Sequence, residues 1–387
     1  MRSLLATLVA ALVITPAAAP AAAPDLDRAE RASYPALQVR RLVTGLDHPW
    51  DVRPIGGGRL LFTQRDRATL SVWEDGRTRS LAFPSSEVWV SGETGLMGLE
   101  VDPDFATNHR VYTCAGGFRA GGRPDVRVVA WRLDDALTRA TKLRVLVSGF
   151  PTSSVTPGRH GGCRLLIDRR GALNVGTGDA ATGANPRNLH SFGGKTLRLD
   201  RFSGRPWPSN PFIRSANRVQ RYVYTYGHRN VQGLAERADG TLWSVEQGTY
   251  RDDEVNRLVR GGDYGYNPVP GYNESVPMTD QRLPGRQRAA VWRSGDPTLA
   301  TSGGGFVTGP GLGAYDGTLA VAALKASRVL FLTLTADGHL RRVHVPDELR
   351  GFGRIRTVVD GPGSTFYVTT DNGGGADAIL QVRPSAG

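Results

Sequence analysis

The chain has 387 residues, of which 40% are hydrophobic and 8% aromatic, a composition that excludes wholesale disorder and allows one large domain or two smaller ones. Its formal net charge is +12, from 48 Lys plus Arg against 36 Asp plus Glu. Only three of these cations are lysines, and the arginines are dispersed along the chain. The charge therefore indicates a solvated basic surface and no nucleic-acid partner.

The first 23 residues are typical of a signal peptide. Arg2 supplies a positive start, residues 4–14 are apolar but too short to span a bilayer, and small residues offer cleavage between Ala19 and Ala23. We expect a secreted protein, extracellular or periplasmic, with no membrane span. Residues 24–42 lack strong strand signals and are expected to be a flexible lead-in.

The rest of the chain, residues 43–387, shows almost no long helical periodicity. Short apolar runs follow turns that contain Gly or a polar residue, and this unit recurs six times at roughly blade-sized intervals. The pattern predicts an all-β fold, a six-bladed β-propeller in which each copy is one strand of a four-stranded blade. Two stacked β-sandwiches would explain the strands but not the repeat. The six copies are anchored at Leu60, Val111, Leu173, Leu242, Leu319 and Phe366.

The two cysteines, Cys114 and Cys163, could form a disulfide in an exported protein. Sequence alone does not show that they meet, so two buried free thiols remain the alternative.

His160 lies in a glycine-rich loop, residues 158–162, directly before a predicted strand. Glycines let the backbone approach a ligand closely, and an imidazole can act as a general base near neutral pH. A cation such as Arg159 would favour the neutral, base-competent imidazole if the two lie close in space. The alternative is a surface or structural histidine.

Two further clusters suggest binding. Arg229 and Asn230, followed by Gln232, form a dense set of polar groups between glycines that suits a planar, oxygen-rich ligand, although a polar turn would look the same. Residues 246–256 bring carboxylates beside loop carbonyls. These hard oxygen ligands suit Ca²⁺, with a solvated acidic turn as the alternative.

Arg354 and Arg356 are two residues apart and would point to one face of a strand. Two adjacent guanidinium groups need an anion between them or water around them. Lys325 is an exception in a chain that uses Arg for almost every cation, which suggests that a lysine has a chemical role there.

Taken together and in order, the motifs resemble the soluble PQQ-dependent glucose/sorbosone dehydrogenases, also called aldose sugar dehydrogenases. The likeness runs over almost the whole mature chain. It comprises residues 45–50, 93–98, 102–105, the His160 loop, 227–234, 246–248, 253–254, 261–265, 324–325, Arg354 and Arg356.

The resemblance implies a six-bladed propeller that holds pyrroloquinoline quinone (PQQ) and Ca²⁺ and oxidises the anomeric carbon of an aldose to a lactone. It implies His160 as the base, and an external electron acceptor that the sequence does not identify. The other implied residues are Glu93, Arg229, Asn230, Lys325, Arg354 and Arg356 for the cofactor, the carbonyls of Gly248 and Thr249 for its Ca²⁺, and Glu254 and Tyr264 for a second, structural Ca²⁺.

Several positions depart from the family pattern around the pocket, which leaves the substrate more open than the cofactor. Glu93 stands where the glucose enzyme has Gln, Arg159 precedes the base where Asn or Asp is usual, and Thr249 replaces Pro. Two other functions stay open: a secreted propeller that binds carbohydrate or cell wall without redox chemistry, and a Ca²⁺-dependent lactonase.

Overall fold

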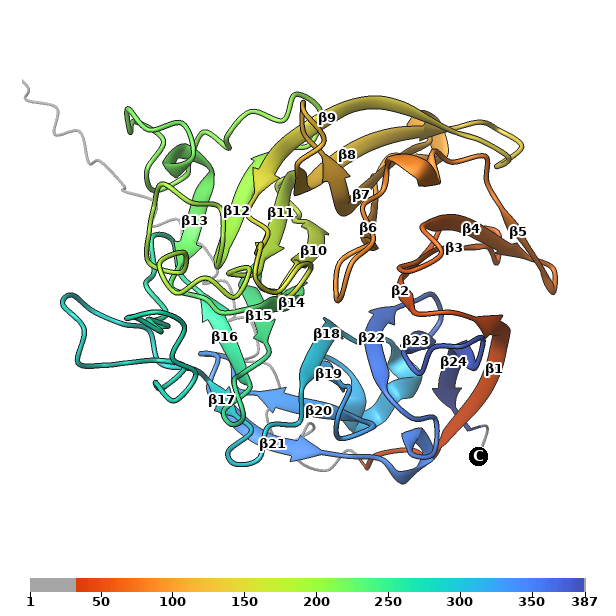
Figure 1. Cartoon of the computed structure of the whole chain (residues 1–387). Helices are drawn as coiled ribbons and strands as arrows, with labels where there is room; N and C mark the ends of the chain where they lie inside the picture. The colour runs from red at the N-terminus through yellow and green to blue at the C-terminus, as the bar shows by residue number, and fades with distance from the viewer. Residues whose placement is uncertain (1–32, 386–387) are drawn as a thin grey trace, which may run out of the picture. The chain divides into compact units, whose positions relative to one another are not determined.

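Residues 33–385, which the computed structural model describes, form six four-stranded antiparallel sheets arranged around a common centre (Figure 1). We number these sheets blades 1 to 6. The first strands of the blades contact one another in sequence, from β2 through β6, β10, β14 and β18 to β22, and β22 contacts β2 again. This ring of first strands confirms the predicted six-bladed β-propeller.

Blades 1 to 5 each take four consecutive strands, and blade 6 takes its outermost strand from the N-terminal part of the chain. Blade 1 has β2 (Pro49–Pro54), β3 (Leu60–Gln64), β4 (Thr69–Glu74) and β5 (Arg77–Ser80). Blade 2 has β6 (Leu96–Val101), β7 (Arg110–Phe118), β8 (Pro124–Leu133) and β9 (Ala140–Phe150). Blade 3 has β10 (Gly162–Ile167), β11 (Ala172–Thr177), β12 (Lys195–Asp200) and β13 (Val223–Tyr226).

Blade 4 has β14 (Val231–Glu236), β15 (Leu242–Glu246), β16 (Glu254–Leu258) and β17 (Trp292–Arg293). Blade 5 has β18 (Thr301–Phe306), β19 (Leu319–Ala323), β20 (Arg328–Leu334) and β21 (Leu340–His344). Blade 6 has β22 (Ile355–Asp360), β23 (Phe366–Thr370), β24 (Asp377–Pro384) and β1 (Leu37–Leu46). Short helical turns occur at α2 (Phe105–Asn108), η1 (Ser85–Glu87), η2 (Gln220–Tyr222), η3 (Pro310–Tyr315) and η4 (Asp347–Leu349).

All six sequence repeats fall in the second strand of a blade, namely β3, β7, β11, β15, β19 and β23. Each repeat therefore marks the same structural position, which is why their number equals the number of blades. The alternative of two stacked sandwiches is wrong.

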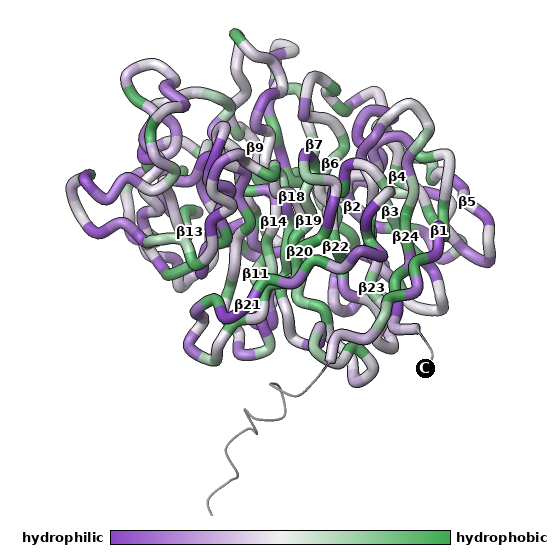
Figure 2. Tube along the Cα trace, turned by 90° about the horizontal axis from the view of Figure 1, so that it is seen from below, coloured by the Kyte–Doolittle hydropathy of each residue, from purple (hydrophilic) through white to green (hydrophobic). Residues whose placement is uncertain are grey.

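Apolar side chains gather between consecutive blades, so each blade covers its neighbour. Blades 5 and 6, for example, enclose Phe331, Val329 and Phe366, all fully buried. Figure 2 shows the apolar residues along the strands and the polar ones largely on the loops. Burial of this kind stabilises the fold by roughly 25 cal/mol per Å² of apolar surface.

The flexible lead-in expected at residues 24–42 is wrong for residues 37–42. These residues belong to strand β1, which begins at Leu37 and pairs along its length with β24. An edge strand of this kind forms because it pairs with a strand far along the chain, so its own sequence gives little indication that it is a strand. The signal peptide predicted at residues 1–23 lies outside the described residues and stays a prediction.

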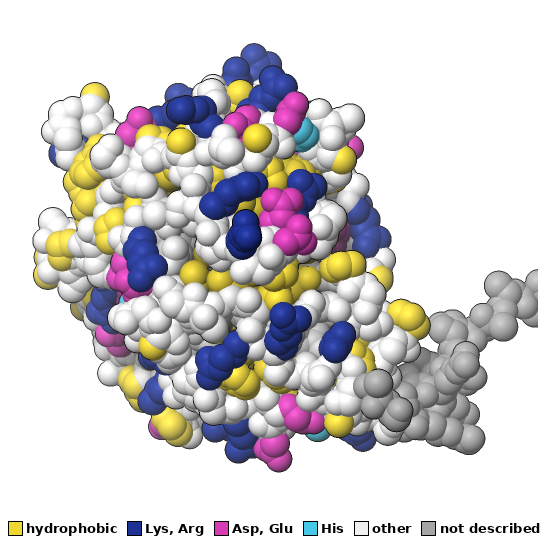
Figure 3. All heavy atoms as spheres, turned by 90° about the vertical axis from the view of Figure 1, so that its right-hand side faces the viewer, with side chains coloured by type: hydrophobic (Ala, Val, Ile, Leu, Met, Phe, Trp, Pro, Cys, Tyr) yellow, Lys and Arg dark blue, Asp and Glu magenta, His cyan; other side chains and the backbone are white. Residues whose placement is uncertain are grey.

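Two surface properties bear on partners. On the face shown in Figure 3, Lys and Arg side chains lie scattered among neutral ones, as expected for a solvated basic surface. Within residues 33–385, no helix has the length and apolar character to cross a bilayer.

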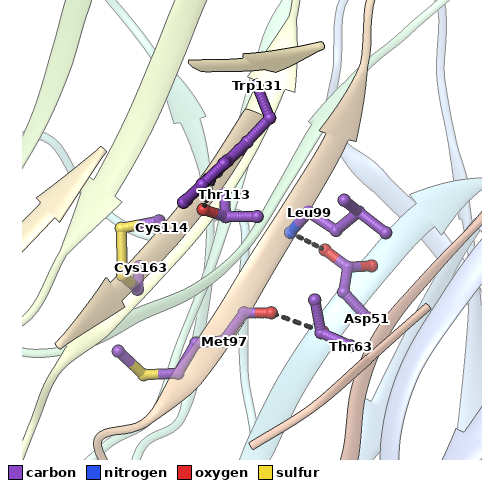
Figure 4. Close-up of a disulfide and its surroundings, with 8 residues drawn as sticks. All are labelled: Asp51, Thr63, Met97, Leu99, Thr113, Cys114, Trp131 and Cys163. Atoms are coloured by element: carbon purple, nitrogen blue, oxygen red, sulfur yellow. Dashed lines mark hydrogen bonds between the residues drawn. A yellow bond between two sulfur atoms is a disulfide. The ribbon is translucent and has the colours of Figure 1, made fainter. Parts of the chain in front are cut away.

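Cys114 and Cys163 form a disulfide, which decides between the two alternatives left open by the sequence. It joins β7 of blade 2 to β10 of blade 3, and both cysteines are fully buried (Figure 4).

The packing between blades 5 and 6 predicts that Phe331→Ala lowers the free energy of unfolding by about 3–5 kcal/mol, because it leaves a cavity beside Tyr315 and Phe366. Denaturant unfolding measures the change. Val155→Ala, at a residue that is 88% exposed, is the control and should change stability by less than about 0.5 kcal/mol. An equal effect of both substitutions would contradict this packing.

Candidate active site

The residues implied to bind the cofactor and to act as base lie at one end of the blades. Since neighbouring strands are antiparallel, the start of a first strand and the end of a second strand lie at the same end of a blade. His160, Arg229, Asn230 and Arg354 directly precede first strands, whereas Gly248, Thr249 and Lys325 follow second strands. The topology thus brings these residues from blades 3 to 6 to one face.

His160 is held by groups from three parts of the chain. Its side chain is 4% exposed, and its Nδ1 lies 2.8 Å from Oδ1 of Asp179. The Tyr272 hydroxyl lies 3.1 Å from the same nitrogen and donates to Oδ2 of Asp179 at 2.9 Å. The backbone N–H of His160 donates to the exposed Glu93 carboxylate at 3.0 Å. Because a carboxylate only accepts, Nδ1 carries the proton and Nε2 is left as the basic nitrogen.

Tyr272 keeps its proton in this setting. Burial, followed by the nearby Asp179 carboxylate, raises the pKa of Tyr272 far above its usual value. The hydroxyl therefore remains a donor and helps to orient the carboxylate that in turn orients the imidazole.

Arg159 turns toward Glu274 and not toward the imidazole beside it. Its Nη2 lies 2.8 and 2.9 Å from the two oxygens of Glu274, and its guanidinium lies over the Tyr272 ring at 5.5 Å from the ring centre. Glu274 also accepts from Nη2 of Arg229 at 2.6 Å. The two arginines therefore share one carboxylate, and Arg159 does not stand as a lone cation next to His160.

Arg229 and Asn230 are buried and have unused hydrogen-bonding atoms. The Arg229 backbone N–H donates to Glu246, and its Nη1 donates to the Gln247 carbonyl at 3.1 Å. Among the described residues, Nε of Arg229 and both side-chain amide atoms of Asn230 have no partner. A Cβ on Gly178 would lie 1.9 Å from the His160 carbonyl oxygen and 2.8 Å from Oδ1 of Asn230, so these two residues meet at Gly178.

Of the two alternatives for Arg354 and Arg356, an anion between them or water around them, the structure supplies an anion, the carboxylate of Asp371. Arg356 is buried and pairs through Nη2 with Asp371, and Nε of Arg354 lies 4.0 Å from the same carboxylate. Nη1 of Arg356 donates to Oγ of Ser302 at 3.1 Å, and its Nε has no partner in the described part of the chain. Lys325 is exposed, and no described residue pairs with its side chain.

Asp371 lies at the centre of this cation cluster. Burial by itself would raise its pKa, but Arg356, His48 and Arg65 outweigh that effect and hold the pKa well below the usual range. Nδ1 of His48 lies 2.7 Å from the carboxylate. Asp371 therefore stays ionised and neutralises part of the local positive charge.

The residues implied to hold the cofactor's Ca²⁺ form a tight turn after β15. The N–H of the buried Gly248 donates to Asp253 at 2.9 Å, and a Cβ on Gly248 would lie 2.3 Å from the Arg251 carbonyl oxygen. The carbonyl oxygens of Gly248 and Thr249 accept no hydrogen bond from any described residue. They are thus free to act as hard oxygen ligands.

Glu254 and Tyr264, implied for a second Ca²⁺, are both buried but have other partners. The Glu254 carboxylate accepts from Thr279 at 2.9 Å, and the Tyr264 hydroxyl donates to the Arg257 carbonyl at 2.6 Å. Within residues 33–385, no group of three or more His, Cys, Asp or Glu side chains could hold a metal ion. The assignment of these two residues to calcium stays a prediction.

Sequence reasoning missed four groups of this site: Asp179, Asp371, Tyr272 and Glu274. Asp179 and Asp371 each follow a second strand, so the repeat register itself could have placed them at the active end. Tyr272 and Glu274 belong to the long connection between β16 and β17, for which the only signal was the wide spacing between the fourth and fifth repeats.

A family model for glucose/sorbosone dehydrogenases matches residues 46–381. The chain belongs to this family, and it is an oxidoreductase of the sugar dehydrogenase type. It is 28% identical over 369 residues to the aldose sugar dehydrogenase YliI of Escherichia coli K12, and this similarity covers 93% of the chain and 96% of the relative.

Two solved structures are similar over nearly their whole length. The PQQ-bound aldose sugar dehydrogenase of Streptomyces coelicolor is 28% identical, with a TM-score of 0.74 and coverage of 91% of this chain and 99% of that one. The apo-form of the soluble aldose sugar dehydrogenase of E. coli is also 28% identical, with a TM-score of 0.80 and coverage of 90% and 100%.

The buried Glu254 predicts a pH-dependent stability in metal-free protein. Burial, followed by the nearby Glu246, raises the pKa of Glu254 to about 8. Between the ordinary carboxyl pKa and pH 8, Glu254 is therefore protonated in the folded protein and ionised in the unfolded protein. This difference stabilises the fold at low pH, and the free energy of unfolding falls as the pH rises toward 8. In EDTA, the free energy of unfolding should fall by about 3 kcal/mol more between pH 5 and pH 8 in the wild type than in Glu254→Gln. Equal pH slopes would contradict the raised pKa.

Proposed function

We propose that the protein is a PQQ- and Ca²⁺-dependent dehydrogenase that oxidises the anomeric carbon of aldose sugars, or of related alcohols, to lactones. The observation that carries the proposal is the His160–Asp179 pair beside the unpartnered donors of Arg229 and Asn230. Family membership supports it, as does the PQQ-bound state of the Streptomyces relative. The same membership favours this function over the carbohydrate-binding and lactonase alternatives.

The residues present fit an anionic, planar quinone. Nε of Arg229, Nε of Arg356 and the amide of Asn230 are buried and have no partner among residues 33–385, which costs free energy unless a ligand or water satisfies them. Lys325 and Arg354 add exposed positive charge from blades 5 and 6. These five residues would hold the three carboxylates and the carbonyl oxygens of PQQ, and the carbonyls of Gly248 and Thr249 would hold its Ca²⁺.

The chain's own groups would carry out proton transfer and charge stabilisation. When bound, PQQ supplies the hydride acceptor, with Ca²⁺ polarising its carbonyl. Nε2 of His160 takes the proton of the anomeric hydroxyl, and Asp179 keeps the imidazole in the required tautomer and stabilises its charged form. Arg229 stabilises negative charge that develops on a neighbouring oxygen. An external electron acceptor completes the cycle.

The base assignment predicts that His160→Ala abolishes dye-linked sugar oxidation in the presence of PQQ and Ca²⁺ while the protein still binds PQQ. Asp179→Asn, which removes the negative charge that stabilises the protonated imidazole and can turn an N–H toward Nδ1, should lower kcat by about 10²–10⁴-fold. His339→Gln, at a side chain that is 80% exposed, is the control and should keep full activity. Unchanged turnover in His160→Ala would remove His160 as the base.

The cofactor assignment predicts that Lys325→Met weakens PQQ binding by about tenfold or more, since it removes an exposed charge facing an anionic ligand. Lys142→Met is a matched control, because Lys142 is also partly exposed but lies on β9 of blade 2 and pairs with Glu87. Titration followed by absorbance gives both dissociation constants. Equal values for the two variants would argue against Lys325 as a cofactor ligand.

A further inference from the structure

The disulfide lies next to the proposed base in sequence and in space. Cys163 is three residues after His160, at the start of β10, and its partner Cys114 lies on β7 of the neighbouring blade. Figure 4 shows the sulfur atoms bridging these blades, with the backbone of Met97 on β6 nearby. The disulfide is therefore a covalent link at the junction of blades 2 and 3, where His160 also lies.

The segment between His160 and Cys163 has an unusual backbone. The φ angles are 54° at His160, 60° at Gly162 and 81° at Cys163, so two residues that carry a Cβ occupy the left-handed region. The pairing of β10 with β11 shifts register between Gly162 and Arg164, which places Cys163 on a bulge. A bulged residue is left out of the ladder, and this conformation persists only when its surroundings hold it.

Blade 2 and the loop before its first strand hold this segment from one side, opposite the contacts that Gly162 and His160 make with Thr177 and Gly178 of blade 3. A Cβ on Gly98 of β6 would lie 2.1 Å from the Cys163 carbonyl oxygen, so the two backbones touch. Oγ1 of Thr94 donates to the Gly158 carbonyl at 2.9 Å, and Glu93 accepts the N–H of His160. Blade 2 and the loop before β6 thus contact the backbone of the segment at Gly158, His160 and Cys163.

The imidazole of His160, in contrast, is oriented from another side. Asp179 follows β11 of blade 3, and Tyr272 belongs to the connection between β16 and β17. The angle at which the ring enters the site therefore depends on how β10 is seated against blade 2.

We propose that the Cys114–Cys163 disulfide is a positioning element for His160. It seats the bulge of β10 against blade 2, so that the His160 backbone reaches Glu93 while its ring reaches Asp179. This rests on the proposed function only in naming His160 as the base. A catalytic group displaced by about 1 Å can lose about 10²-fold in rate, so a loosened junction lowers turnover before it unfolds the protein.

The test compares the wild type with Cys114→Ala/Cys163→Ala and with Cys114→Val/Cys163→Ala, which retains more of the buried volume and guards against misfolding. Val329→Ala, in the core between blades 5 and 6, is the control for general destabilisation. The first readout is hydrogen exchange of residues 160–163 in the cofactor-free protein. The second is kcat and KM with PQQ, Ca²⁺ and an aldose, measured well below the unfolding temperature of each variant.

Loss of the disulfide should accelerate exchange at residues 160–163 by about tenfold or more and lower kcat by a similar factor, with KM within about twofold of the wild type. Val329→Ala should change neither the exchange rate nor kcat, even if it lowers the unfolding temperature as much as loss of the disulfide does. Unchanged exchange or unchanged kcat in both disulfide variants overturns the proposal. A wild type that is inactive with PQQ overturns the proposed function instead, and the exchange result then decides the positioning role alone.

Discussion

The pairing of β1 with β24 closes the ring on which the rest of the structure depends. Each blade covers its apolar faces with its two neighbours, so an open ring would expose the facing sides of blades 1 and 6 to water. The site depends on the same closure, because its groups come from blades 2 to 6 and meet only when the first strands surround one axis. The assembly of the site therefore requires hydrogen bonds between chain segments that are more than 300 residues apart in the sequence.

Around this ring the site divides into two parts of different chemistry. One part, at blades 2 and 3, contains the imidazole of His160 with a carboxylate on its protonated nitrogen. The other, at blades 5 and 6, gathers positive charge that Asp371 only partly neutralises. Arg229 and Asn230, just before the first strand of blade 4, lie between them in ring order and carry donors and acceptors that no described residue satisfies. A single anionic, oxygen-rich ligand that meets both parts accounts for this distribution of charge and of unsatisfied polar groups.

The fold was predictable because the repeat marks the second strand of every blade, a buried position with a strong apolar signal. The start of the fold was not, since β1 is an edge strand defined by its partner β24. The site residues likewise divide into those that the sequence could predict and those that it could not. His160, Arg229 and Asn230 lie directly before first strands, so the sequence pattern of those strands also gives their position. Tyr272 and Glu274 reach the site through a long connection whose path depends on tertiary contacts, and Arg159 finds its partner in that connection. Local residues therefore could not predict that Arg159 is neutralised.

The central claim is that this site binds PQQ and that the protein uses it to oxidise an aldose. The most direct measurement is an absorbance titration of the purified wild-type protein with PQQ in the presence of Ca²⁺, followed by addition of a series of aldoses and an artificial electron acceptor. The account predicts a saturable spectral change at micromolar PQQ and reduction of the acceptor that requires both PQQ and an aldose. The absence of a spectral change at that concentration, or a bound cofactor that no aldose or related alcohol reduces, would contradict it.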